Sequence, residues 1–492
     1  MRQNSLSYAT PESLGIPSGA VTGFLDDLAD KGLCMHGFLL LRGGKVAAEG
    51  YWPPFDENRK HRMYSVSKSF TSVAVGMMIG AGKLSLDSRA AEFFPEYLSE
   101  GTHAHTLSAT VRDLLMMATC NENTSYTHDS DDFSEAFFAD PGPKHKPGMI
   151  FSYDTAATTV LCAIVEKLSG KDMLATMRPV LDEIGFSDDA WCVKTPEGRS
   201  WTGSGILCTA RDLARFALLC ANEGAWNGKQ LVDRAYMRAA VSRQIDNAAS
   251  GGGPEFRFGY GYQFWRIRGG GFAMYGMGCQ LALCMPKEDA ILITVADTQG
   301  TAEAEGLVCG AFFRLLERFS SGPLQEDPPA LAELNKRIGE LALPLPRGEC
   351  VTPMAGAISG RKYVLDENKA GMKWLRLVIS PERCRLQYEN ASGAHELVFG
   401  MGRYEPQLFP ERYYGKRIGV RDAQYRCIGA GAWTDRNALL CTLYSVDDHL
   451  GSIRIILSFG GDEVCGYMIK AAEWFFDAYQ GFLSGRAEPG HG

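Results

Sequence analysis

The chain has 492 residues, of which 45% are hydrophobic and 22% are charged, the usage of an ordinary globular protein. Its length is about three times that of a typical ~150-residue domain, so we expect two domains. The formal net charge of −8 is mild for this size, and no basic stripe suggests a partner such as nucleic acid or an anionic membrane.

The chain lacks the sequence features of a membrane or exported protein. No apolar run approaches the ~18–20 residues that a membrane span needs. Residues 1–15 contain one arginine and no apolar core of the kind that a secretory signal carries. We therefore expect a cytoplasmic protein that contacts neither nucleic acid nor a membrane.

The fourteen cysteines and nine histidines show no metal-ligand spacing. There is no C-x-x-C pair and no H-E-x-x-H, and most cysteines lie in apolar runs such as 160–164. Buried free thiols in a reducing compartment account for the cysteines better than disulfides or a metal site. We predict no metal and no organic cofactor.

The N-terminal part of the chain begins with one helix and two strand patterns. Apolar positions at helical spacing predict an amphipathic helix over 18–31. Two short apolar runs, 37–41 and 45–51, flank Gly43-Gly44 and predict a hairpin.

Mainly helical patterns extend from about residue 84 to residue 241. Thr110 and Thr209 are predicted helix N-caps, the second with Asp212 at capping-box spacing, and 160–168 is a predicted apolar helix. Strand patterns then return, followed by another helix. These elements are the strands 259–267, 271–275 and 281–295 and the helix 302–318. Strands at both ends of a helical insert predict one α+β unit whose sheet is completed by distant segments.

A proline-rich segment separates this unit from a strand-rich region. Six prolines lie between residues 321 and 353 around one short helical stretch, the composition of a linker. The strand patterns that follow predict a small antiparallel β domain. The predicted strands are 373–380, 383–389, 439–446, 452–459 and 463–469. We therefore expect an α+β domain over 1–320, a linker over 321–355 and a C-terminal β domain over 356–492.

The most informative segment is His61–Ser72, which runs into an apolar stretch. Ser65 and Lys68 stand three residues apart at the start of a predicted buried helix, so both side chains lie on one face. A serine hydroxyl needs a neighbouring base to attack a carbonyl at neutral pH. A lysine removed from water can take up that proton, and the helix N-terminus stabilises developing negative charge.

The spacing of serine and lysine alone is weak evidence, because about two chance matches are expected in a chain of this length. The chain contains two such pairs. The second, Ser359 with Lys362, lies in a glycine-containing turn with no apolar helix behind it. We interpret this second pair as a chance match.

Two further motifs supply the other groups that acyl transfer needs. Tyr153 stands at the entry of the predicted helix near residue 160, where a phenol or phenolate can share proton transfer with Lys68. Gly276-Met277-Gly278 lies between two predicted strands, and glycine there lets a backbone N–H approach a substrate carbonyl. Taken alone, the tyrosine is also compatible with ordinary packing and the glycines with a turn.

Together and in this order, the three motifs resemble the serine β-lactamase and penicillin-binding-protein superfamily. The segment Tyr64–Ser72 is similar to the class C β-lactamase-related branch of esterases, D-amino-acid peptidases and 6-aminohexanoate-dimer hydrolases, as are residues 114–119 and 205–215. The resemblance covers about residues 8–320. It implies a β-lactamase-like fold, with an antiparallel sheet flanked by helices and a helical lobe.

The resemblance also implies roles for individual residues. Ser65 would be the nucleophile that accepts the acyl group, Lys68 its base or proton shuttle, and Tyr153 the general acid and base. The oxyanion hole would use the backbone N–H groups of Ser65 and Met277, with Cys279 as the alternative to Met277.

The second and third motifs depart from the family pattern. The family often has Tyr-x-Asn, whereas this chain has Tyr153-Asp154-Thr155 and so lacks the asparagine amide. True β-lactamases and penicillin-binding proteins have Lys-Thr-Gly, whose cation binds the antibiotic carboxylate, whereas Gly-Met-Gly has no cation. Both departures argue against efficient β-lactam hydrolysis or cell-wall peptidase action.

Candidate substrate-binding residues come from two places. Tyr126, His128 and Asp131 lie in a polar loop that is expected to overhang the site, and Trp201 and Trp265 are expected to line an apolar acyl pocket. Each residue is also compatible with an ordinary position on the surface or in the core.

The sequence therefore predicts a cytoplasmic serine hydrolase that cleaves a small ester or amide through an acyl-enzyme. A D-amino-acid amidase or peptidase and a β-lactamase-type enzyme are alternatives, and so is a non-catalytic ligand-binding protein on a hydrolase-derived fold. We expect a structural role for the C-terminal domain. Covering the active site, limiting substrate size and forming a homodimer are its alternative roles.

Overall fold

The computed structural model describes residues 6–127, 129–142, 144–249, 253–411, 425–447, 449–473 and 475–489. The chain forms two compact units, the first extending to Ala342 and the second beginning at Leu343. This boundary falls inside the proline-rich segment 321–355.

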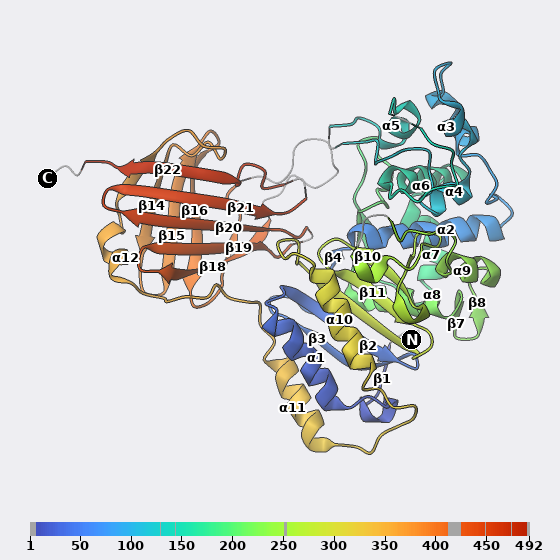
Figure 1. The fold of residues 1–492 in the computed structure, drawn as a ribbon, viewed down its shortest axis with the longest axis horizontal. Coiled ribbons are helices and arrows are strands. Elements are labelled where there is room, and N and C mark those ends of the chain that lie inside the picture. Colours follow the sequence, from blue (N-terminus) through green and yellow to red (C-terminus); the bar gives the residue numbers. More distant parts are fainter. Residues whose placement is uncertain are drawn as a thin grey trace. The chain divides into compact units, whose positions relative to one another are not determined.

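The first unit is built on a seven-stranded sheet in the order β1-β3-β2-β12-β11-β10-β9 (Figure 1). Neighbouring strands are antiparallel except for β1 and β3. The strands are β1 Ser7–Tyr8, β2 Met35–Arg42, β3 Lys45–Tyr51, β9 Trp265–Arg266, β10 Phe272–Gly276, β11 Gln280–Met285 and β12 Ala290–Ala296. The pairing of β2 with β12 confirms that distant segments complete one sheet.

Helices cover both faces of this sheet because β2 is apolar on both sides. On one face, Phe24 of α1 (Ser18–Asp30) lies 6.1 Å, centroid to centroid, from Phe38 of β2. Helices α10 (Ala304–Leu316) and α11 (Pro328–Gly339) pack against α1. On the other face, α8 (Ala210–Ala221) packs against β2, β11 and β12.

The remaining helices gather in a lobe beside the sheet (Figure 1). They are α2 Ser67–Gly80, α3 Ala104–Ser108, α4 Val111–Leu115, α5 Phe133–Ala139, α6 Thr155–Ser169, α7 Met173–Leu181 and α9 Arg234–Val241. Helix α6 is the centre of this lobe, since residues 156–165 are all buried and α2, α4, α5 and α7 pack against it. Short strands β4 His61–Arg62, β5 Trp191–Cys192, β6 Ile206–Cys208, β7 Ala225–Trp226 and β8 Lys229–Gln230 complete the unit.

The predicted strand over 259–267 is wrong for most of its length, because only Trp265–Arg266 pairs in the sheet. Gly259 has φ +108° and Gln263 has φ +64°. These left-handed conformations interrupt an extended strand, although the residue types favour one.

The second unit is a ten-stranded sheet that closes on itself through the parallel pairing of β16 with β18. The strands are β13 Lys362–Leu365, β14 Trp374–Ile379, β15 Arg383–Asn390, β16 Gly393–Met401, β17 Glu405–Leu408, β18 Arg426–Asp435, β19 Ala438–Ser445, β20 Ser452–Gly460, β21 Glu463–Ala471 and β22 Gly481–Ala487. Alternate side chains face an interior of aliphatic and aromatic groups, and α12 (Pro353–Ile358) adds Ile358 to it.

These elements confirm the expected α+β class and a C-terminal unit built of β-strands. Five strands of the second unit were not predicted from the sequence. They are β13, β16, β17, β18 and β22. Within the described part of the chain, no helix has both the length and the apolar character that a bilayer crossing requires.

Both predicted N-caps are confirmed, and each forms a complete capping box. At α8, the Asp212 backbone N–H donates to Thr209 Oγ1 over 3.1 Å. In return, the Thr209 backbone N–H donates to the Asp212 carboxylate over 3.1 Å. The Thr209 hydroxyl donates to the same carboxylate over 2.8 Å. The box fixes the start of the helix that supports one face of the sheet.

We expect Thr209→Ala to lower the free energy of unfolding by about 1 kcal/mol, because the cap hydroxyl is lost. Thr209→Ser keeps the hydroxyl and should retain most of the stability. Urea unfolding of the three proteins tests this, and equal losses in both variants would show that the hydroxyl is not the stabilising group.

Candidate active site

The segment that carries Ser65 has an unusual backbone conformation. Tyr64, a non-glycine residue, has φ +46°, and residues Tyr64–Val66 form a single 3₁₀ turn that continues into α2. The buried Arg62 guanidinium lies 4.6 Å from the Tyr64 ring centroid, and Arg62 Nε donates to the Ser204 carbonyl over 2.9 Å. Such strain persists only where the surroundings hold it, which is typical of functional sites.

Ser65 and Lys68 are in direct contact, as their spacing predicts. Lys68 Nζ lies 2.9 Å from Ser65 Oγ and 2.5 Å from the Gly203 carbonyl oxygen, to which it donates. The lysine side chain is only 1% exposed. A buried amine held at this distance can exchange a proton with the serine hydroxyl.

Tyr153 reaches the same serine from the start of α6. Its hydroxyl is hydrogen-bonded to Ser65, and burial raises the pKa of the phenol above its usual range. The Lys68 amine lies 5.1 Å from the Tyr153 ring centroid. Ser65 Oγ is therefore in contact with two groups that can transfer protons, a lysine and a protonated phenol.

Asp154, the next residue, is a fully buried carboxyl group that caps α6. Its Oδ1 accepts the Ala156 N–H over 2.8 Å, and its Oδ2 accepts the Thr119 hydroxyl over 3.2 Å. Burial raises the pKa of this carboxyl to about 7, against the opposing effects of these hydrogen bonds and of the Lys68 charge. The Asp154 carboxyl is therefore a titratable group that interacts electrostatically with Lys68.

The third motif lies where β10 meets the segment that carries Ser65. A Cβ on Gly276 would be only 2.2 Å from the Met63 carbonyl oxygen, so glycine is required for this approach. Met277 follows in the turn, which the Gln280 side chain holds by donating to the Met277 carbonyl over 3.0 Å and to the Ala296 carbonyl over 2.6 Å. This places the predicted oxyanion-hole residue in the turn directly after the close contact.

Cys279 ends the same turn with φ +66° and is buried. Its sulfur accepts the Thr298 hydroxyl over 3.1 Å. Burial raises the pKa of the thiol to about 12, so it is not a thiolate at neutral pH.

The four candidate pocket residues that the structure describes differ in placement. Trp265 is buried and stacks on Tyr153, with ring centroids 5.4 Å and planes 22° apart. Trp201 is 1% exposed and donates from its indole N–H to the Tyr126 hydroxyl over 2.9 Å, so these two residues pack as a buried pair. Asp131 is exposed on the loop before α5. His128 lies outside the described residues.

Three groups that hold the site together were not predicted from the sequence. They are the Gly203 carbonyl, the Asp154 carboxyl and the Gln280 amide. A Cβ on Gly203 would be 2.6 Å from Thr155 Cγ2, so the turn lies tightly against the start of α6. The glycines at 203 and 205 are the available signal for this turn, but they do not reveal which side chain its carbonyl accepts.

The second serine–lysine pair belongs to the second unit. Ser359 ends α12, where its Oγ accepts the Ile379 N–H over 3.0 Å. Lys362 donates from β13 to Glu488 over 2.6 Å. Both side chains therefore have partners that stabilise local structure.

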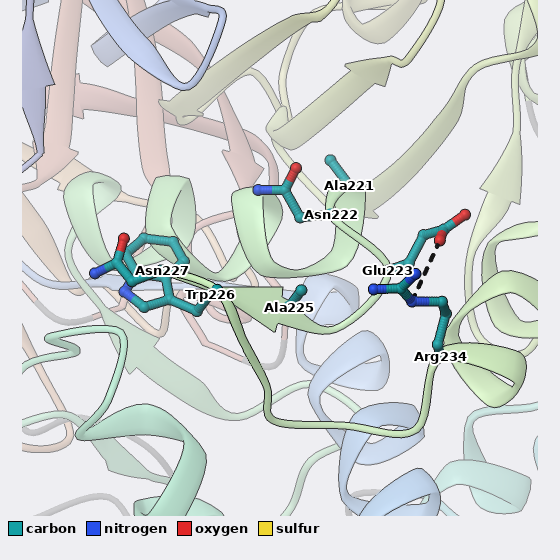
Figure 2. A pocket seen from close by; sticks show the side chains of 8 residues that line it. Ala221, Asn222, Glu223, Ala225, Trp226, Asn227 and Arg234 are labelled. Carbon is teal, nitrogen blue, oxygen red and sulfur yellow. Dashed lines mark ion pairs between the residues drawn. The ribbon is translucent and has the colours of Figure 1, made fainter.

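A surface hollow at the end of α8 contains none of the predicted catalytic residues (Figure 2). It is lined by Ala221, Asn222, Glu223, Ala225, Trp226, Asn227, Gly228 and Arg234. Figure 2 shows the Glu223 carboxylate facing Arg234 Nε, 4.0 Å away. We do not include this hollow in the candidate site.

Comparison with protein families identifies the family to which the chain belongs. The model of the Beta-lactamase family matches residues 28–307, more than half of the chain and all three motifs. The chain belongs to the Beta-lactamase family. This assignment confirms the resemblance to the serine β-lactamase and penicillin-binding-protein superfamily and indicates a hydrolase.

Individual members of this group are distant from the chain. The 6-aminohexanoate-dimer hydrolase of Paenarthrobacter ureafaciens is 25% identical over 320 residues, which cover 58% of this chain and 79% of that protein. A solved structure of a candidate 6-aminohexanoate-dimer hydrolase from Bacillus anthracis is 20% identical, covers 64% of this chain and 88% of that chain, and has a TM-score of 0.52. The D-amino acid amidase of Ochrobactrum anthropi SV3 is 15% identical, with coverages of 61% and 97% and a TM-score of 0.49.

We expect Gly276→Ala to reduce hydrolysis of p-nitrophenyl acetate about a hundredfold, because an added Cβ moves β10 away from the segment that carries Ser65. Gly306→Ala is the matched control, since a Cβ there, within α10, meets nothing within 4 Å. Initial rates and circular dichroism spectra of both variants test this. Unchanged hydrolysis by the folded Gly276→Ala variant would contradict the requirement for the close approach.

We expect Asp154→Asn to change how stability depends on pH. The carboxyl has a pKa of about 7 in the folded protein and near 3.8 when unfolded, so between these values the folded state binds more protons. Wild-type stability should therefore fall as pH rises from about 4 to about 7, and the variant should lack this contribution. Urea unfolding of the wild type and the variant at pH 5 and pH 7.5 measures the free energy of unfolding on which this prediction depends.

The exposed N-cap Asp172 of α7 provides the matched control, as Asp172→Asn. The variant at Asp154 should gain stability relative to wild type between pH 5 and pH 7.5. Parallel pH dependence of the wild type and the Asp154→Asn variant would show that this carboxyl does not titrate in that range.

Proposed function

We propose that the chain is a serine hydrolase that cleaves a small ester or amide through an acyl-enzyme on Ser65. The observation that best supports this is the 2.9 Å contact between Ser65 Oγ and the buried Lys68 Nζ. Tyr153, hydrogen-bonded to the same serine, supplies a second proton-transfer group. A serine is activated by one neighbouring base, and a second proton-transfer group can serve the leaving group.

In the first half of the proposed reaction, Ser65 Oγ attacks the substrate carbonyl carbon and its proton passes to Lys68 Nζ. The Tyr153 phenol donates its proton to the leaving alcohol or amine as the bond to the carbonyl carbon breaks. Its raised pKa supports this role, because the phenol is protonated at neutral pH. The proton on Lys68 then restores the phenol, so the proton count balances.

The developing oxyanion is proposed to bind the backbone N–H groups of Ser65 and Met277. Gly276 supports this assignment by bringing the end of β10 against the residue that precedes Tyr64. Water then attacks the acyl-enzyme carbonyl and gives up a proton to the same lysine–tyrosine pair. The pair delivers that proton to Ser65 Oγ as the bond between Oγ and the acyl carbon breaks, which releases the acid and restores the serine.

Trp265 is proposed to form one wall of the substrate site, because its ring stacks on Tyr153. The name of the 6-aminohexanoate-dimer hydrolase, 25% identical, supports a small-molecule substrate. Contributions of Tyr126, Asp131 and Trp201 to binding stay predictions. The choice between ester and amide, the cytoplasmic location and the homodimer are likewise predictions from the sequence.

We expect a fluorophosphonate to add one phosphonyl group to the wild-type protein and none to Ser65→Ala, because the nucleophile has been removed. Intact-protein mass spectrometry measures the adduct. The other serine–lysine pair offers a matched control, since Ser359→Ala should be labelled like the wild type.

Absence of an adduct on folded wild-type protein would contradict the hydrolase and favour the non-catalytic binding protein. Labelling of Ser65→Ala would place the nucleophile elsewhere. Turnover of p-nitrophenyl esters compared with D-amino-acid amides would then separate the esterase from the amidase.

A further inference from the structure

A row of aromatic rings extends from the catalytic tyrosine to the end of β10. Trp265 stacks on Tyr153, and its ring centroid is 6.3 Å from that of Tyr275. Phe256 stacks on one face of Tyr275, with ring centroids 4.7 Å and planes 14° apart. Tyr153 and Tyr275 are both partly exposed, so the row includes surface that a ligand can reach. The faces of such rings attract cations.

A carboxylate lies at the β10 end of this row. Glu305, in the first turn of α10, is partly exposed. It acts electrostatically on Tyr275 and on Cys279, which flank the third motif, and after burial it is the largest contribution that raises the pKa of Tyr275. A Cβ on Gly253 would lie 3.4 Å from Glu305 Oε1, which places the carboxylate beside the loop that leads to Phe256.

Within the described part of the chain, Glu305 has no hydrogen bond or ion pair. Arg268, which lies against Phe313 of α10, is held by the Glu255 carboxylate over 2.7 Å. A carboxylate in the first turn of a helix is favoured by the helix dipole. The helix dipole explains why a carboxylate is stable at position 305. It does not explain why this carboxylate lies beside aromatic rings and close to the third motif.

We propose that Glu305 and the partly exposed Tyr275 ring, with the buried Trp265 packed beside it, bind a cationic group of the substrate, so that the enzyme prefers esters or amides that carry an ammonium group. This inference rests on the proposed role of Ser65 and extends it to the class of substrate. Ring faces and a carboxylate together attract an alkylammonium group, and the same carboxylate repels a substrate carboxylate.

Three fluorophosphonates with one linker and different ends test the inference. The ends are trimethylammonium, its neutral isostere tert-butyl, and carboxylate. We expect the cationic probe to label Ser65 about tenfold faster than the neutral one, and the anionic probe to be slowest. The preference should shrink as ionic strength increases, because salt screens the carboxylate. Intact-protein mass spectrometry gives the rate constants.

Glu305→Gln should reduce the cation preference to about twofold, and Glu305→Lys should reverse the order of the probes. Glu317→Gln removes the same charge from the far end of α10 and should keep the preference. Each preference is the ratio of the labelling rates of two probes on the same variant. A general loss of reactivity therefore leaves the preference unchanged.

Equal labelling by the three probes, or an unchanged preference in Glu305→Gln, would overturn the inference while leaving the role of Ser65 intact. Failure of all three probes to label folded wild-type protein would overturn the proposed function and the inference with it. The two failures are therefore distinguishable.

Discussion

The contact between Lys68 Nζ and Ser65 Oγ is the interaction on which the rest of the site depends. An exposed lysine would be solvated and would not stay at 2.9 Å from a hydroxyl, because its flexible chain loses entropy when it is held. Here the side chain is almost fully buried, and the Gly203 carbonyl gives the amine a second oxygen partner. The surrounding structure therefore keeps this lysine away from water and hydrogen-bonded.

Three segments far apart in the chain converge on that contact. The start of α2 provides the serine and lysine, the start of α6 provides Tyr153, and the end of β10 provides the third motif. Two glycines allow the segments to approach. Gly203 admits the methyl group of Thr155, and Gly276 admits the Met63 carbonyl, and in both places a side chain would force the backbone apart.

Local signals in the sequence predicted much of the first unit. The N-cap threonines, the hairpin around Gly43-Gly44 and the apolar helix near residue 160 are all present. Prediction failed where neighbouring structure overrides residue preference, as at Gln263, whose left-handed conformation ends a run of strand-forming residues. It failed again for five strands of the second unit, where pairing partners decide which segments are extended.

The sequence by itself determined the contact between Ser65 and Lys68, because residues three apart meet through the geometry of a single helical turn. It also identified Tyr153 and Gly276-Met277-Gly278 as the remaining motifs, through their order along the chain. Only the tertiary structure decided that Tyr153 contacts the serine, that Trp265 stacks on Tyr153, and that Trp201 is buried against Tyr126 instead. Contacts of this kind join residues separated by many turns and strands, so they depend on how those elements pack and not on local spacing.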